Sequence, residues 1–398
     1  MSARALEPTP LEIAVGTVLG GEASEPPLEV SGRREPPRAA LERALLPALE
    51  RPPCAVSFSG GRDSSVTLAV AVALARREGL DPPIAVTARF RHAPGTGESE
   101  WQELVAGHLR LGDWVRLELE DELDLVGPVA AGLLRRHGVL HPPHTSLFAL
   151  LAERTGCRSL VTGFGGDQVF GGWLGIRDSE RLPDGWGRAA SVAVYAAVPR
   201  RFRRLVLRRE LPVRPWLTEA ARRAFERRWL DVASAEPATW SGYLRWLARR
   251  RTMASVRRSL GVALGERGAV GVHPLLDRGF LAALASDGGR TGLGGREALL
   301  RLLAGDVLPQ EIIARRSKAH FHHAYFRGPS RAFARRWDGA GLDPALVDPE
   351  RLRQAWLGRW PRGSSALALQ AAWLASTGDE LEEAPAGLGQ ELDARWAP

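Results

Sequence analysis

Residues 59–65 read Ser-Gly-Gly-Arg-Asp-Ser-Ser, and this heptad combines residue types that bind phosphate groups. Gly60 and Gly61 let the backbone approach an anion closely, which a side chain would hinder. A carboxylate beside phosphates is repulsive unless a cation lies between them, so Asp63 is a candidate Mg²⁺ ligand. Three hydroxyl groups can donate further hydrogen bonds, those of Ser59, Ser64 and Ser65. The heptad therefore predicts a pyrophosphate-binding loop that holds ATP with Mg²⁺.

The flanking segments place the heptad between a strand and a helix. The apolar run Cys54–Ser59 predicts a buried strand, and Ser64–Glu78 predicts a helix that ends at Gly79. A helix N-terminus presents unpaired N–H groups and a dipole that favours anions. The heptad matches neither the Walker pattern nor the dinucleotide-binding fingerprint. A tight strand-to-helix turn capped by serine is the alternative interpretation.

A second glycine-rich segment, residues 162–173, reads TGFGGDQVFGGW and contains one carboxylate, Asp167. It follows the short apolar run Ser159–Thr162, which predicts another strand. Asp63 and Asp167 therefore both follow the carboxyl ends of strands, where open α/β sheets bind ligands. We expect the two carboxylates to converge on one Mg²⁺–pyrophosphate site. A helix cap is the alternative role for Asp167 alone.

Lys318 is the only lysine among 54 basic residues, so the other 54 − 1 = 53 are arginines. Arginine could supply a surface charge equally well, and a lysine kept against this bias indicates a need for a compact ammonium group. We interpret Lys318 as a cation that stabilises charge developing on phosphates. A solvated lysine at a helix end is the alternative.

Strands alternate with helices over about residues 40–180, which predicts a parallel α/β sheet. Two further strands are expected at Ile84–Phe90 and Trp114–Leu119, with helices at Ala39–Leu49, Glu98–Leu111 and Leu147–Thr155. After Pro199, helical periodicity dominates to about Thr377. We expect four parts: an N-terminal extension (1–38), an α/β domain (39–198), a helical lobe (199–378) and an acidic tail (379–398).

Composition excludes some classes of protein. No apolar run approaches the length of about 18 residues that a membrane span needs, and no signal peptide is evident at the N-terminus. Cys54 and Cys157 lack metal-ligand spacing, which favours a reducing cytoplasm. The net charge is +8, and arginines cluster in 200–228 and 245–258. We interpret both clusters as helices with solvated basic faces; a groove for an acidic substrate or nucleic acid is the alternative.

Three segments together resemble the asparagine synthetase-like branch of the N-type ATP pyrophosphatases, which cleave ATP between the α and β phosphates. Residues 59–65 resemble the SGG-x-DS motif, residues 162–173 resemble S-G-E-G-x-D-E-x-F-G-G-Y, and residues 308–321 resemble LP-x-E-I-x-x-R-x-K-x-x-F. In the second segment six residues fall in register: Gly163, Gly165, Asp167, Phe170, Gly171 and Gly172. The resemblance covers about residues 40–375 and includes β-lactam and lasso-peptide macrolactam synthetases.

The resemblance implies a five-stranded parallel sheet of the adenine nucleotide α-hydrolase-like (HUP) type with a C-terminal helical lobe. It implies that ATP and Mg²⁺ bind over the sheet and that Lys318 stabilises the acyl-adenylate transition state and pyrophosphate. Residues that would line the ATP site are Ser57, Phe58, Thr87, Thr162 and Gly163. The segment 272–280 resembles the family's VPFLD, and we interpret Asp277 there as structural.

The chain also departs from the pattern. Phe164 stands where asparagine synthetases have Glu and β-lactam synthetases have Tyr, and Gln168 replaces the next Glu. Phe cannot accept a proton, so His141 or His144 is a candidate replacement base. The G-G-D form and the segment Glu98–Trp101 are closer to lasso-peptide cyclases. Polar lining of the acceptor pocket is a candidate role for the imidazoles at His320, His322 and His323.

We therefore expect an ATP-dependent, AMP- and pyrophosphate-forming amide synthetase that adenylates a carboxylate and transfers it to an amine or ammonia. About 50 residues precede the loop and position 2 is Ser2, so we expect no intrinsic glutaminase. A separate amidotransferase or a precursor peptide is a candidate partner, and neither nucleic acid nor membrane is expected. The alternatives are a tRNA-modifying ATP pyrophosphatase and a catalytically silent nucleotide-binding scaffold.

Overall fold

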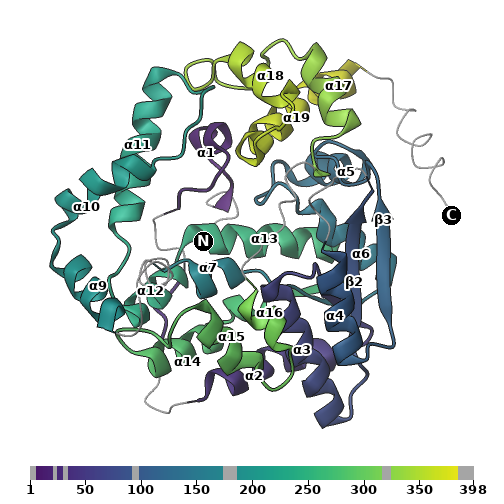
Figure 1. Cartoon of the computed structure of the whole chain (residues 1–398). Coiled ribbons are helices and arrows are strands. Elements are labelled where there is room, and N and C mark those ends of the chain that lie inside the picture. The colour runs from purple at the N-terminus through teal and green to yellow at the C-terminus, as the bar shows by residue number, and fades with distance from the viewer. Residues whose placement is uncertain are drawn as a thin grey trace.

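The computed structural model describes residues 6–20, 25–29, 35–91, 98–173, 186–315 and 324–383. Within them, one five-stranded sheet runs through the α/β part of the molecule (Figure 1). All neighbouring strands are parallel, in the order β3-β2-β1-β4-β5. The strands are β1 (Cys54–Ser57), β2 (Ile84–Phe90), β3 (Trp114–Leu119), β4 (Ser159–Val161) and β5 (Val270–Val272).

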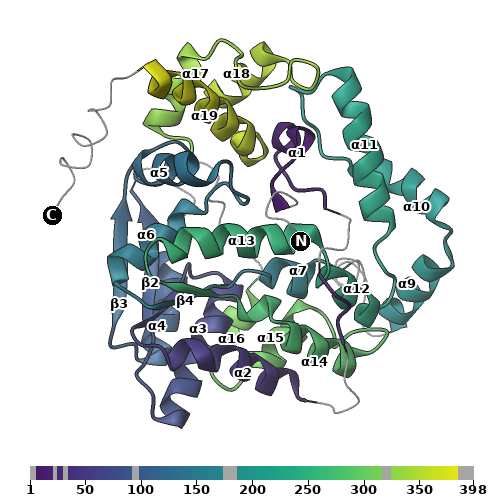
Figure 2. The same cartoon turned by 180° about the vertical axis from the view of Figure 1, so that it is seen from behind.

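The side chains of β1 alternate between two helical layers. Cys54 and Val56 pack in one hydrophobic cluster with α2 (Pro37–Leu49) and α3 (Arg62–Glu78). Ala55 packs in another with α6 (Ser146–Thr155) and α13 (Arg251–Gly265). Because both faces are covered, the central strands β1 and β4 are mostly apolar, as their sequences predict. The sheet is therefore the middle of three layers (Figure 2).

Most remaining helices follow residue 199, in the part of the chain that is expected to form a helical lobe (Figure 1). Those that precede the lobe are α1 (Pro10–Val15), α4 (Ser99–Leu109), α5 (Pro128–His137), α7 (Gly166–Gly171) and α9 (Trp186–Ala197). Those of its first half are α10 (Arg200–Leu207), η2 (Arg208–Glu210), α11 (Glu219–Ser234), α12 (Trp240–Leu247), η3 (Pro274–Leu276) and α14 (Arg278–Gly288). The rest are α15 (Arg296–Ala304), α16 (Gln310–Ala314), α17 (Gly328–Arg336), α18 (Pro349–Leu357), η5 (Gly363–Ser365) and α19 (Ala366–Glu383).

A second hydrophobic core packs α1, near the N-terminus, against helices that follow residue 199. Ala14 and Val15 of α1 pack with residues of α11, α17, α18 and α19, around the buried rings of Trp216 and Trp356. The carboxylate of Glu12, which is 1 % exposed, pairs with Arg251 at 2.7 Å and accepts the backbone N–H of Leu19 at 2.8 Å. Burial of a paired, hydrogen-bonded carboxylate fixes this segment against α13.

This packing corrects one expectation. The interpretation of residues 245–258 as a solvated basic face is wrong for Arg250 and Arg251. The guanidinium of Arg250 lies 4.5 Å from the ring centroid of Trp246, and Arg251 pairs with buried Glu12. These guanidinium groups stabilise the N-terminal segment and do not line an open groove.

The predicted α/β pattern is confirmed by the structure. The bounds of β2 and β3 match the sequence expectation, and β1 and β4 each end within two residues of it. The C-cap Gly79 of α3 has the expected left-handed φ of 68°. Asp277 caps α14 by accepting the N–H of Phe280 at 2.9 Å, so its structural role is confirmed. β5 lies in a stretch where the sequence shows helical periodicity, because three residues are too few to produce a strand signal.

Candidate functional site

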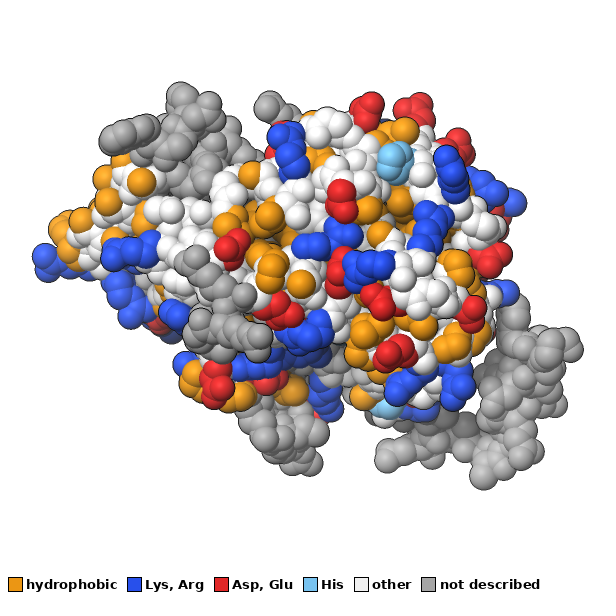
Figure 3. All heavy atoms as spheres, turned by 90° about the horizontal axis from the view of Figure 1, so that it is seen from below, with side chains coloured by type: hydrophobic (Ala, Val, Ile, Leu, Met, Phe, Trp, Pro, Cys, Tyr) orange, Lys and Arg blue, Asp and Glu red, His pale blue; other side chains and the backbone are white. Residues whose placement is uncertain are grey.

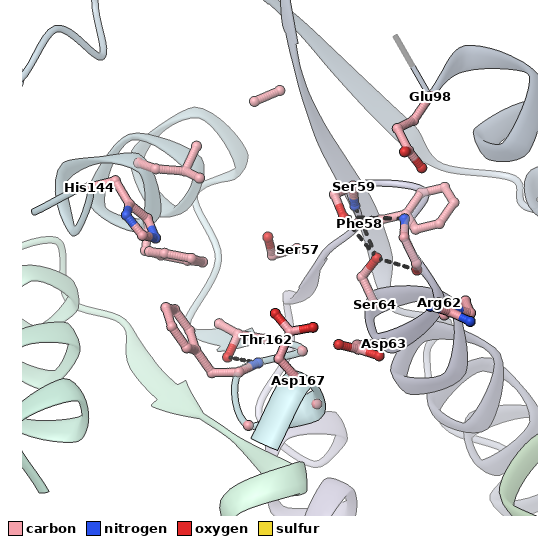
Figure 4. Close-up of a pocket in the computed structure, with 18 of the residues that line it drawn as sticks. Ser57, Phe58, Ser59, Arg62, Asp63, Ser64, Glu98, His144, Thr162 and Asp167 are labelled. Carbon is pink, nitrogen blue, oxygen red and sulfur yellow. Dashed lines mark hydrogen bonds between the residues drawn. The ribbon is translucent and has the colours of Figure 1, made fainter. Parts of the chain in front are cut away.

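A cavity of about 340 Å³ opens at the carboxyl ends of β1, β2 and β4. Figure 4 shows residues of the heptad and Asp167 towards one end and His144 at the other. The rings of Phe148 and Phe164, which also line the cavity, lie beside that of His144. Ser57 lies between the two ends in the figure. The cavity is thus polar where the two glycine-rich segments meet and aromatic where it approaches α6.

The heptad is held by its own hydroxyl groups. Ser64 Oγ lies 3.1 Å from Ser59 Oγ, accepts the Ser59 N–H at 3.2 Å and donates to Gly61 O at 3.0 Å. Ser65 Oγ also donates to Gly61 O, at 2.9 Å. Gly60 has a φ of +85°, and a Cβ there would lie 2.8 Å from Gln102 Cγ, so only glycine fits. The loop leads directly into α3, whose N-terminus lies at the cavity.

Glycines bring the second segment against the first. A Cβ on Gly166 would lie 2.3 Å from Asp63 Cγ, and one on Gly163 would lie 3.1 Å from Ser64 N. Gly165 has a φ of +96°, which a side chain rarely adopts. Side chains at these positions would push α7 away from α3. The glycines therefore allow Asp63 and Asp167 to share one end of the cavity.

Arg296, at the start of α15, lies between the two carboxylates. Its Nη2 is 3.0 Å from Asp63 Oδ1 and 3.4 Å from Asp167 Oδ1. Among the described residues, its buried Nε is one of the few side-chain nitrogens without a hydrogen-bond partner. A buried donor without a partner, on a residue that lines the cavity, fits a site completed by a phosphate oxygen.

A buried ion pair between two residues that line the cavity fixes the loop. Arg315 and Glu98, whose side chains are 4 % and 3 % exposed, form a two-pronged contact through both guanidinium Nη atoms. Arg315 Nη1 also donates to Gly60 O at 2.9 Å, and its Cζ lies 4.6 Å from the Trp101 ring centroid. Removing one partner of such a pair typically costs about 3–5 kcal/mol. The pair ties the loop, α4 and the end of α16 together.

Rings stack at the other end of the cavity. The ring of His144 is nearly parallel to that of Phe164, with centroids 6.3 Å apart, and also stacks on Tyr325 at 5.5 Å. The ring centroids of Phe148 and Phe164 lie 5.3 Å apart. Of the two candidate replacement bases, His144 lines the cavity, whereas His141 is not among its lining residues. Loss of hydration raises the pKa of the Tyr325 phenol well above its usual value and keeps it neutral.

His273, on the loop after β5, supports the second segment. Its Nδ1 lies 2.7 Å from Thr162 Oγ1, and Thr162 follows β4. Burial lowers the pKa of His273 to about 4, because the charged imidazolium would lose its hydration. Burial likewise lowers the pKa of His141 to about 4. Both imidazoles are therefore neutral at physiological pH.

These two histidines predict a loss of stability in acid. An unfolded chain binds protons at these imidazoles as the pH falls below about 6.5, whereas the folded protein binds them only near pH 4. The free energy of unfolding should therefore fall between pH 6.5 and 4, by roughly 3 kcal/mol for each histidine at the low end. Urea unfolding across this range measures it. His273→Gln should flatten the dependence, and an unchanged slope would contradict the assignment.

The structure brings most of the predicted site residues together around the cavity. Those that line it are Ser57, Phe58, Ser59, Gly61, Asp63, Ser64, Thr162, Gly163 and Asp167. Gly60 and Ser65 shape the loop without lining the cavity. Thr87 is buried, where it donates to Phe58 O at 2.6 Å and accepts from Trp114 Nε1 at 2.9 Å. Lys318 and the histidines at 320, 322 and 323 lie outside the described residues.

Sequence reasoning did not single out Arg296, Arg315 or His273. Arg296 and Arg315 are two of 53 arginines, so residue type carried no signal. Glu98 lies in a segment singled out by resemblance, yet its ion pair joins residues 217 positions apart. Within the described ranges, no three metal-binding side chains of the His, Cys, Asp and Glu types are grouped. Mg²⁺ commonly binds one or two carboxylates and completes its shell with substrate phosphates and water, so a two-carboxylate site fits that ion.

A comparison with protein families agrees with this geometry. The family model described as asparagine synthase matches residues 38–376. The chain belongs to the asparagine synthase family. The match includes the sheet, both glycine-rich segments and most of the lobe. No curated protein matches the chain significantly.

Membership of the asparagine synthase family establishes the general chemistry. The family comprises ATP-dependent amide-forming synthetases, so this protein is a ligase-type enzyme that uses ATP. The five-stranded parallel sheet agrees with the HUP-type fold of the asparagine synthase domain, and the predicted fold class is confirmed. Across the described parts of the chain, no helix is long and apolar enough to cross a membrane.

Proposed function

We propose that this asparagine synthase family member adenylates a carboxylate with ATP, releases pyrophosphate, and transfers the acyl group to an amine or ammonia with release of AMP. The observation that carries the proposal is the convergence of Asp63 and Asp167 at the phosphate-binding loop. Arg296 is one cation beside two carboxylates, and the phosphates of ATP add further negative charge, which a Mg²⁺ ion bound by both carboxylates would balance.

The chain's own groups account for binding of the triphosphate. N–H groups at the start of α3 and the hydroxyl of Ser59 would hold the β and γ phosphates, and Asp63 with Asp167 would hold Mg²⁺. A Mg²⁺ ion held there would neutralise charge on the leaving pyrophosphate. Arg296 donates through Nη2 to both carboxylates and has Nε left for a phosphate oxygen. With Mg²⁺ present, this arginine would move from the carboxylates towards the phosphates.

We assign the second cation at the phosphates to Lys318. It follows Arg315 by three residues, a reach of at most about 11 Å, and Arg315 contacts the loop at Gly60 O. An ammonium near the scissile bond stabilises the charge that develops on pyrophosphate and on the acyl-adenylate. Asp63, Asp167 and Lys318 are thus the proposed catalytic residues.

The acyl donor and the amine bind at the aromatic end. The carboxylate is a small molecule or a peptide, and the amine belongs to the substrate or is ammonia supplied by a separate amidotransferase. A precursor peptide is a further candidate partner. We place the enzyme in the cytoplasm, without a nucleic-acid partner.

A hydroxylamine assay tests this function. A panel of carboxylic acids is incubated with ATP, Mg²⁺ and hydroxylamine, which replaces the unknown amine, and AMP, pyrophosphate and hydroxamate are measured. We expect at least one acid to give the three products in equal amounts. ADP and phosphate as products would contradict the proposal, and no nucleotide cleavage with any acid would favour a silent scaffold. Cleavage that requires tRNA would favour the tRNA-modifying alternative.

A further inference from the structure

Helix α10 packs against the protein with its charged side. Arg204 Nη1 lies 2.5 Å from Asp231 Oδ1 and Arg208 Nε lies 2.6 Å from Glu226 Oε1, both on α11. Arg203 Nε donates to Val198 O at 2.9 Å. At helical spacing, positions 200, 203, 204 and 208 share one face. Arg204 and Arg208 therefore pair with α11 while they stay 39 % and 61 % exposed, as the interpretation of a solvated basic face expects.

The apolar side of α10 faces solvent. Phe202, Leu205 and Val206 are 50 %, 64 % and 64 % exposed, and no residue of this helix is buried. An amphipathic surface helix normally buries its apolar stripe, so α10 is inverted. Exposure of three large apolar side chains on eight residues costs solvation free energy that folding does not recover. The exposed apolar face indicates a surface that binds a partner in the functional state of the protein.

Neighbouring segments extend this surface. Val194 on α9 and Val213 after η2 are 64 % and 68 % exposed, and α9 also exposes small apolar residues such as Ala193 and Ala197. Five of the nine large hydrophobic side chains that are exposed in the described residues lie between positions 194 and 213. We call these five the apolar arm surface: Val194, Phe202, Leu205, Val206 and Val213.

The arm lies at one side of the molecule, away from the sheet (Figures 1 and 2). The left end of Figure 3, where α9 and α10 lie, shows hydrophobic side chains beside Lys and Arg side chains. Arg201 and Arg209 flank the apolar face of α10 and are exposed. Contact with this end of the molecule would leave the cavity at the sheet accessible.

The positive charge around the apolar arm surface indicates what kind of partner binds there. The net charge of +8 and the flanking arginines oppose pairing with a second copy of the chain and favour an anionic surface. Helices that lie in a membrane interface combine Phe and Leu on one face with arginines at the edges, which α10 reproduces. Arginine side chains can reach lipid headgroups while their stems stay among apolar groups.

We propose that the apolar arm surface adsorbs to an anionic lipid surface, with Phe202, Leu205 and Val206 entering the headgroup region and Arg201 and Arg209 binding lipid phosphates. This is peripheral contact and not a membrane span, and it goes beyond the absence of a membrane partner expected from the sequence. It is independent of the proposed chemistry, because the arm does not line the cavity. Adsorption would bring the enzyme to substrates held at a membrane.

Co-sedimentation with vesicles tests the proposal. The full chain is mixed with vesicles of phosphatidylcholine alone or of phosphatidylcholine with phosphatidylglycerol, at low and high salt. We expect binding to the anionic vesicles, weaker binding at high salt, and little binding to the neutral ones. Phe202→Ser/Leu205→Ser should lower the partition constant about ten-fold or more. Leu104→Ser, on exposed Leu104 of α4, is the matched control and should bind like the unchanged protein.

Several outcomes would overturn the proposal. Equal binding to neutral and anionic vesicles, no binding to either, or unaltered binding by the double variant would each do so. A dimer in sedimentation equilibrium that the double variant converts to a monomer would assign the arm to a second copy instead. Arg201→Glu/Arg209→Glu provides a second variant: it should lower binding to anionic vesicles only, and circular dichroism verifies that each variant folds.

Discussion

Replacing Asp63 with asparagine is expected to lower the rate of pyrophosphate release about 10²–10³-fold. The amide keeps the size of the side chain but removes the charge that binds Mg²⁺ and pairs with Arg296. Pyrophosphate release is measured with whichever carboxylate the hydroxamate screen identifies. Loss of a single charge-stabilising contact at the scissile bond accounts for this magnitude, about 3–4 kcal/mol of transition-state stabilisation.

The control for Asp63→Asn is Asp81→Asn, the same chemical change at an exposed position after α3, away from the cavity. Asp81→Asn should keep the original rate. Raising the Mg²⁺ concentration should partly restore Asp63→Asn, since the lost contact is to the metal. An unchanged rate of pyrophosphate release by Asp63→Asn would contradict a metal-binding role for Asp63.

Replacing Lys318 with alanine is expected to reduce pyrophosphate release by a similar factor, about 10²–10³-fold. Lys318→Arg should retain part of the rate, because the charge remains while the compact ammonium is lost. Arg154→Ala removes an exposed cation on α6 that does not line the cavity, and is the control. A rate unchanged by Lys318→Ala would contradict the mechanism even if ATP still binds.

The sole lysine also allows a measurement that needs no substrate. An amine-selective reagent can modify only Lys318 and the N-terminal amine, so mass spectrometry reads its accessibility directly. We expect MgATP to protect Lys318 from modification in the full chain and Asp63→Asn to weaken that protection. Equal labelling with and without MgATP would place this lysine away from the nucleotide.

The sequence predicted the sheet and the phosphate loop because both are local. A buried strand, adjacent glycines and a helix start lie within 25 residues of one another from Cys54 to Glu78, and the structure has β1 and α3 there. Asp167 was also predicted, because its glycine-rich segment follows a strand in the same way. Its approach to Asp63 depends on Gly166, whose missing Cβ leaves room for the Asp63 carboxylate.

The rest depends on contacts between residues far apart in the chain. Arg296 reaches Asp63 across 233 positions, and Arg315 reaches Glu98 across 217. Neither arginine stands out by type in a chain with 53 of them, whereas Lys318 does. The amphipathic pattern of α10 is visible in the sequence, but the sequence does not show which side of the helix faces α11. That orientation depends on the ion pairs with Asp231 and Glu226.

The central claim is that a carboxylate oxygen attacks the α-phosphate of ATP at the loop of residues 59–65. It is tested most directly with a carboxylate substrate labelled with ¹⁸O in both oxygens, under conditions of complete turnover to amide or hydroxamate. The account predicts that one labelled oxygen appears in AMP and none in inorganic phosphate or pyrophosphate. Label in inorganic phosphate, with ADP as the nucleotide product, would contradict it.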